Sequence, residues 1–347
     1  GSIADYRGIT KGYPFYFNHA LAIALIIAVW REDRRSFRWL PPGLGWYLLY
    51  CGISTLSIVN ATEKNLVLMT THKMVFASVI MLATFNRLRT EEDMKFFLRV
   101  MALTMAWELY VCLKMKYLGH MYQVHGTFEH QNPLAMYSVC IGMIFLAVGL
   151  GPAFPKSNRM LYAFAACAII VECTLSRAAL LSFALGTIGV IAASLGEKIT
   201  SRRLVVTATL GVIGVIGVTL SLDTIISRFN DRGNEASGEL REVMKNACRA
   251  MVHDCPLLGI GWNNYALLIN RPYPYADIYY DWDISRGMKP DYDHPNGVVE
   301  SHYYLLMAEN GYLGLSAWLA VIAIGIRSLS RPSSFLFSSS TGTTLRW

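Results

Sequence analysis

Long stretches without a charged residue constrain the fold of this chain more than any other feature. Residues 39–62, 134–155, 178–196 and 204–222 contain no Asp, Glu, Lys or Arg. About 20 apolar residues in a helix cross the ~30 Å hydrocarbon layer of a membrane. Only 16% of the residues are charged, against roughly 25% in an average soluble domain. The sequence therefore predicts an all-α polytopic membrane protein.

The apolar periodicity divides the chain into nine expected spans. Residues 1–222 are predicted to form a transmembrane bundle of eight spans, 223–302 a large loop region, 303–330 the last span and 331–347 a polar C-terminal tail. The spans are expected at about 15–30, 40–59, 66–86, 96–117, 134–150, 160–175, 178–195, 204–222 and 303–326.

Basic residues predict the orientation, because Lys and Arg gather in short cytoplasmic loops of membrane proteins. They are concentrated in alternate loops, at 31–38, 87–95, 156–159, 198–203 and 327–331. This pattern puts the large loop on the outer face of the membrane, which for the inner membrane of a bacterium with two membranes is the periplasm. An odd number of spans also puts the first residue outside, which suggests an upstream helix. Loop charge explains the net charge of +7, so membrane lipids rather than nucleic acid are the expected partners.

The large loop contains one amphipathic pattern, at 237–252. Apolar residues recur at helical spacing, while Arg241, Lys245 and Arg249 follow each other at four-residue steps on another side. Pro256 ends this pattern, and residues 263–300 have no clear period, which predicts a long loop. Its aromatic residues suit either sugar stacking or a membrane-interface belt. These are Trp262, Tyr265, Tyr273, Tyr275, Tyr279, Tyr280 and Trp282.

The seven cysteines give no metal-ligand spacing and no CxxC pair. Most lie in apolar runs, where Cys behaves as a small hydrophobic residue. Cys248 and Cys255 share the large loop, and they are able to form a disulfide if this loop is outside the cell membrane. Neither a metal nor another cofactor is expected.

Polar residues with possible chemical roles form four groups on the predicted outer side. They are GTFEHQN (126–132), the SR pair at 176–177, the arginine helix leading into PLLGIGWNNY (256–265), and a cluster before AENGYLGL (308–315). The cluster contains Asp291, Asp293, His294, Glu300, His302 and Glu309. Histidine titrates near neutral pH and is a common general base.

In these four patterns and their order, residues 120–326 resemble the O-antigen ligase/polymerase family of membrane glycosyltransferases. The resemblance implies transfer of a glycan from undecaprenyl diphosphate to an acceptor hydroxyl, without metal. The acceptor would be another glycan or a lipid A core. Arg177 and Arg241 would bind the diphosphate, and a histidine of the loop would activate the acceptor.

The chemistry of such a transfer explains these residue types. A departing lipid diphosphate carries negative charge, and arginine offers a permanently charged, planar fork of donors. A sugar hydroxyl is a poor nucleophile, so a base within hydrogen-bond reach accelerates its attack.

One position departs from the family pattern. Ligases commonly have a His-Asn pair nine residues before the glutamate of the closing motif, where this chain has Glu300-Ser301. The base is therefore left open among His302, His294 and Glu300, and the departure favours a polymerase-like member.

Five further residues are candidates for supporting roles. Arg249 and Lys245 share the basic stripe of Arg241, and Glu172 precedes Arg177 by little more than one helical turn. Glu309 lies just inside the last predicted span, where a charge usually faces a cavity or a partner. His130 stands at the start of a predicted span.

Two other functions remain open at this point. Lys73, Glu108 and Glu172 lie in apolar runs, and charges near the membrane midplane are typical of transporters and channels. A non-catalytic subunit of a polysaccharide assembly complex would need only a loop that binds a partner.

Overall fold

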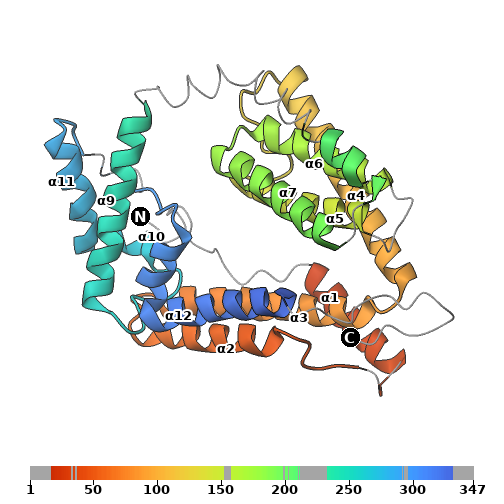
Figure 1. Ribbon diagram of the computed structural model, residues 1–347. Coiled ribbons are helices and arrows are strands. Elements are labelled where there is room, and N and C mark those ends of the chain that lie inside the picture. Colours follow the sequence, from red (N-terminus) through yellow and green to blue (C-terminus); the bar gives the residue numbers. More distant parts are fainter. Residues whose placement is uncertain are drawn as a thin grey trace. The chain divides into compact units, whose positions relative to one another are not determined.

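The computed structural model describes residues 17–32, 34–35, 37–151, 158–197, 200–201, 203–209, 211, 233–290, 292 and 296–330. Within these ranges, helices are the only regular secondary structure (Figure 1). They are α1 (Phe17–Glu32), α2 (Leu44–Thr55), η2 (Leu56–Val59), α3 (Lys64–Arg87), α4 (Glu91–Leu113), η3 (Lys114–Leu118), α5 (Gln131–Leu150), α6 (Asn158–Thr174), α7 (Arg177–Glu197), α9 (Gly233–Asp254), α10 (Tyr265–Leu268), η4 (Pro274–Ala276), α11 (Asp277–Ser285) and α12 (His302–Ser330).

The all-helical, multi-pass class is confirmed, while the count of nine spans is not. Five of the described helices are long and apolar enough to cross a membrane: Lys64–Arg87, Glu91–Leu118, Gln131–Leu150, Arg177–Gly196 and His302–Arg327. Helices α1, α2 and α6 coincide with predicted spans but have only 16, 12 and 17 residues, fewer than any of these five helices. Most of the predicted span 204–222 lies outside the described residues.

The chain divides into two compact units, and each is described by itself. Unit 1 contains the described residues up to Arg87 together with 233–330, and unit 2 contains those from Leu88 to Gly211. The domain boundaries expected from the sequence stay a prediction. Unit 2 is a group of apolar helices, α4 to α7, whose core is centred on Met105, Leu134, Phe145 and Ile170.

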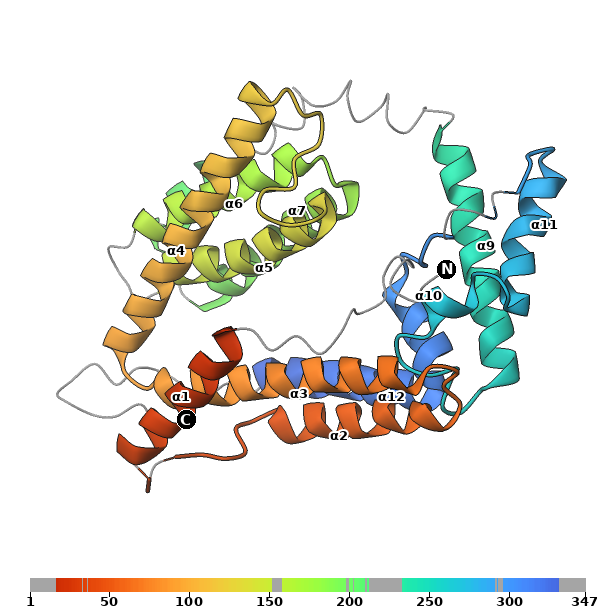
Figure 2. The same cartoon turned by 180° about the vertical axis from the view of Figure 1, so that it is seen from behind.

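In unit 1, helices from both ends of the chain pack together. Helix α2 contacts α3 and α12, and these helices lie side by side in both views (Figure 2). Trp262 of the large loop packs into their shared core with Tyr50 and Leu306. The N-terminal helices therefore support the region that carries most of the candidate residues.

The predicted amphipathic helix is confirmed as α9. Its apolar face, including Val243, Ala247 and Met251, is buried against residues of α10, α11 and the start of α12. The basic residues Arg241 and Lys245 lie on its exposed side. Amphipathic spacing of this kind is a direct consequence of the 3.6-residue helical repeat.

The prediction of a loop over 263–300 is wrong in part, because α10, η4 and α11 lie within it. Helix α11 has only nine residues, too few to show a helical period in the sequence. Its Ile278, Tyr279 and Trp282 pack on the same core as α9.

The aromatic residues of this segment form a protein core rather than a membrane belt. Trp262, Tyr265, Tyr279 and Tyr280 are buried. Tyr265 donates its hydroxyl to the Met244 carbonyl at 3.2 Å and also bonds the Tyr279 hydroxyl at 2.9 Å. Burial raises the pKa of Tyr265, so this phenol stays protonated and available as a donor.

Helix α12 is bent at Gly311, where φ is +63° and the helical path is interrupted. The predicted span 303–326 is therefore not one straight helix. The bend lets the ring of His302 approach that of Trp318, with 5.6 Å between their centroids. A straight helix would separate residues 16 positions apart by about 24 Å, at 1.5 Å per residue.

Candidate functional site

Three of the predicted site residues gather where the end of the large loop meets α9. The Nε of Arg241 donates to Oε2 of Glu300 at 2.8 Å, and both side chains are substantially exposed. His302 follows two residues later as the exposed first residue of α12. Two residues span at most about 7 Å of backbone. A guanidinium, a carboxylate and an imidazole thus belong to one small region of unit 1.

The rest of the basic stripe forms a second cluster along α9. Glu242 bonds Lys245 at 3.1 Å and Arg249 at 2.8 Å. Arg249 also donates to the Tyr304 hydroxyl at 3.3 Å. The two cations hold the pKa of Glu242 below its usual value. Sequence reasoning missed Tyr304, whose only signal was its place one helical turn after Glu300.

Glu309 lies in a buried contact between the two closing family-like segments. Its carboxylate accepts the backbone N–H of Tyr265 at 3.2 Å, and its own carbonyl accepts the N–H of Gly261 at 3.1 Å. Further backbone bonds join Ile260 to Ala308 and Tyr312 to Pro256. The segment 256–265 is therefore clamped onto the bend of α12.

Glycines make this close approach possible. A Cβ on Gly259 would lie 2.4 Å from the Glu309 carbonyl carbon, and one on Gly311 would lie 2.3 Å from the Leu257 oxygen. Both residues have positive φ, a backbone conformation that residues other than glycine rarely adopt. The glycines of PLLGIGWNNY and AENGYLGL thus have a structural role in setting the position of the bend.

The N-terminal helices hold the same segment from another side. Asn264 accepts the Glu63 N–H at 2.8 Å, and the Trp262 N–H donates to the Ser57 hydroxyl at 2.9 Å. Asn60 donates to the Gly259 carbonyl at 3.0 Å. These contacts link residues about 200 positions apart in sequence, and no local pattern in the sequence could reveal them.

Arg177 and Glu172 belong to unit 2, where both are exposed. Arg177 is the first residue of α7, and Glu172 lies in the last turn of α6. Leu175 and Ser176 connect the two helices, with Leu175 at a φ of 53°. The role of Arg177 in diphosphate binding stays a prediction, as does the ability of Glu172 to orient Arg177.

The GTFEHQN segment forms the turn that starts α5. His130 caps this helix, since its Nδ1 accepts the Asn132 N–H at 3.2 Å. The buried Glu108 accepts both the N–H of Thr127, at 3.1 Å, and its hydroxyl. A Cβ on Gly126 would lie 2.5 Å from the Glu108 carboxylate. The contacts of this segment explain why Gly and Thr occupy it.

The structure adds little about the remaining candidate residues. His294, Asp291 and Asp293 lie outside the described residues. Cys248 and Cys255 are free thiols. In the parts of the chain that the structure describes, no three His, Cys, Asp or Glu residues gather as a metal site.

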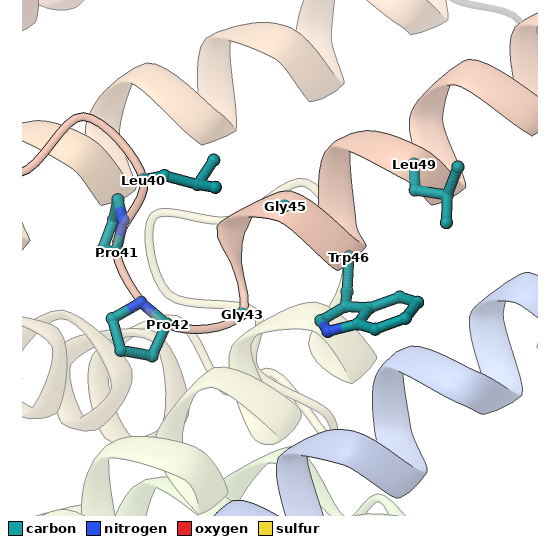
Figure 3. A pocket seen from close by; sticks show the side chains of 7 residues that line it. All are labelled: Leu40, Pro41, Pro42, Gly43, Gly45, Trp46 and Leu49. Atoms are coloured by element: carbon teal, nitrogen blue, oxygen red, sulfur yellow. The ribbon is translucent and has the colours of Figure 1, made fainter.

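A hollow at the start of α2 is lined by none of the candidate site residues. Figure 3 shows its lining, which contains no titratable side chain: Leu40, Pro41, Pro42, Gly43, Gly45, Trp46 and Leu49. Trp46 and Leu49 are exposed, as expected of side chains that face lipid. It does not mark the candidate site.

Apolar helices together with an extended polar segment define a multi-pass helical membrane protein. Residues 162–319 match the model of the family described as O-antigen ligase, and this match supports membership of the O-antigen ligase family. It also supports glycan transfer of the O-antigen ligase or polymerase kind, by a membrane glycosyltransferase that uses a lipid-linked glycan and an acceptor. Neither a curated protein nor a solved structure matched the chain.

Proposed function

We propose that this protein transfers a glycan from undecaprenyl diphosphate to an acceptor hydroxyl at the periplasmic face of a bacterial inner membrane. The acceptor is another glycan or a lipid A core. The contact that carries the proposal is the 2.8 Å bond between Arg241 and Glu300, two residues before His302. It joins a cation to one candidate base, Glu300, and the second candidate, His302, follows close by in the part of the chain that the family match covers.

In the proposed reaction the acceptor oxygen attacks the anomeric carbon of the donor sugar with inversion. A new C–O bond forms as the bond from the anomeric carbon to the diphosphate oxygen breaks. The acceptor proton passes to the base, for which His302, His294 and Glu300 are the candidates. The departing diphosphate gains negative charge, which the Arg241 guanidinium stabilises through charge-assisted hydrogen bonds.

Arg177 is proposed as the second diphosphate-binding cation. Its support is the sequence resemblance and its exposed place at the first residue of α7. The positive end of a helix dipole adds to the favourable potential for an anion at such a position. Lys245 and Arg249 are proposed to support substrate binding beside Arg241, and Glu172, Glu309 and His130 to support the geometry.

The test is a transfer assay with purified protein, a lipid-linked oligosaccharide and an acceptor glycan, in the presence of EDTA. We expect product with EDTA present and a loss of about 100-fold or more for substitution of the true base. His302→Ala, His294→Ala and Glu300→Gln are compared one by one, with the exposed His253→Ala as the control. An inactive wild type, or full activity in all three variants, would contradict the proposed chemistry.

A further inference from the structure

Glu300 contacts Arg241 in a way that favours a different role from that of a base. The carboxylate meets the guanidinium at Nε, through Oε2, at 2.8 Å. An arginine side chain carries five N–H donors, one on Nε and four on the two terminal nitrogens. A carboxylate on Nε leaves the terminal pair as the edge with which arginine binds phosphate in a bidentate manner.

The contact also connects two elements that are far apart in the sequence. Arg241 lies on α9, and Glu300 lies 59 residues later, just before α12. Helix α9 is held by its buried face, whereas the Arg241 side chain is long and 45% exposed. A single anchor on Nε therefore restricts the direction in which this flexible side chain presents its terminal nitrogens. Restricting a flexible cation before the ligand arrives lowers the entropic cost of binding.

The Glu300 carboxylate already accepts a hydrogen bond from a guanidinium, through Oε2. A general base needs an acceptor atom within hydrogen-bond reach of the acceptor hydroxyl, and this oxygen is already engaged. His302 has no such cation among its ring contacts in the described chain, which are Tyr303 and Trp318. Of these two candidates for the base, His302 thus fits the role better.

We propose that Glu300 is a positioning residue, which orients the Arg241 guanidinium for a diphosphate group and does not accept the substrate proton. The inference rests on the proposed function in naming a lipid-linked diphosphate as the ligand. It assigns Glu300 to the donor-binding step and leaves the proton to a histidine.

Another ion pair on the same helix provides a matched control. Arg286, the residue that follows the end of α11, bonds Glu239 of α9 at 3.1 Å, and both side chains are exposed. This pair also joins α9 to another element of unit 1, but neither residue belongs to the proposed site. Glu239→Gln therefore measures the effect of losing an exposed interhelical ion pair alone.

The experiment measures transfer rates against donor concentration and pH for wild type, Glu300→Gln, Glu300→Ala and Glu239→Gln. A positioning role predicts that Glu300→Ala raises the donor KM by roughly fivefold, the most that an exposed ion pair usually contributes. The kcat and its pH profile stay near those of wild type, and Glu300→Gln has a smaller effect because its amide oxygen still accepts from Nε. Glu239→Gln changes neither constant.

Two further arms separate this inference from the proposed function. In an Arg241→Lys background, which has no Nε, a positioning role predicts that Glu300→Ala causes no further loss of transfer rate. If Glu300 were the base, the same substitution would still lower the rate by its full factor. Titration with inorganic pyrophosphate measures the affinity for a diphosphate group independently of glycan transfer. If the wild type binds pyrophosphate more tightly than Glu300→Ala does but transfers no glycan, the positioning role of Glu300 is supported and the proposed function is contradicted. A collapse of kcat in Glu300→Gln, with loss of the acidic limb of the pH profile, overturns the positioning role.

Discussion

Glu309 accepts a hydrogen bond from the backbone N–H of Tyr265 across 3.2 Å, although 44 residues separate them in the sequence. The side chain is buried, and leaving a buried donor without its acceptor costs about 1–3 kcal/mol. We expect Glu309→Leu to lower the free energy of unfolding by that amount, and Glu309→Gln to lower it by less. Thermal unfolding in detergent measures both. The exposed Glu242→Leu is the control, and an equal loss there would contradict a structural role of Glu309.

The bend of α12 requires a glycine at position 311. A side chain there would meet the Leu257 carbonyl oxygen at 2.3 Å, at a φ of +63°. We expect Gly311→Ala to destabilise the protein by more than about 2 kcal/mol, since both overpacking and backbone strain act on it. A Cβ added to Gly325, in the same helix, would meet no heavy atom within 4 Å, so Gly325→Ala is the matched control. The yield of monodisperse protein in size-exclusion chromatography distinguishes the two, and equal yields would refute the clash.

The proposed orientation predicts which thiols are accessible from outside the cell membrane. Met288, in the large loop, and Glu92, at the start of α4, are both exposed. We expect a membrane-impermeant maleimide to label Met288→Cys in cells with a permeabilised outer membrane, and to label Glu92→Cys only after lysis. Labelling of the parent chain sets the background from its seven cysteines. The reverse pattern would put the large loop in the cytoplasm.

A hydrogen bond from the Tyr275 hydroxyl, at 2.6 Å, lowers the pKa of Asp254 below its usual value. Because the folded-state pKa is the lower one, this contribution to stability is present above the unfolded pKa of about 3.9. It is lost as the pH falls through the folded-state value. We expect the thermal stability of Tyr275→Phe to rise less steeply between about pH 3 and pH 5 than that of wild type. Parallel curves for the two proteins would contradict the coupling.

Local patterns in the sequence predicted the longer helices but not the contacts between them. Apolar spacing predicted α9 and its exposed Arg241, since burial of one helix face repeats every three or four residues. The same method missed α11, which is too short to show a helical period. It also missed the bend at Gly311, because a glycine within an apolar run does not by itself indicate that the helix is interrupted. The buried positions of Tyr265 and Tyr279 were also missed, since composition alone does not distinguish a core from a membrane interface.

The candidate site was predictable in its residue types but not in its pairing. The contact between Arg241 and Glu300 joins positions 59 apart, and the clamp on Glu309 joins positions 44 apart. Such contacts arise where α9 and α10 pack on α12, and this packing depends on the whole fold of unit 1. The sequence therefore indicated Glu300 as a candidate site residue but did not predict Arg241 as its hydrogen-bond partner.

The transfer rate of Arg241→Ala, set against that of Arg286→Ala, tests the account most directly. Both arginines are exposed and each forms one ion pair involving α9, so their removal differs chiefly in the proposed contact with the donor diphosphate. The account predicts that Arg241→Ala lowers glycan transfer from the lipid-linked donor by about 100-fold, the usual effect of removing a donor that stabilises developing charge, while Arg286→Ala transfers at the wild-type rate. Equal rates in the two variants would contradict it.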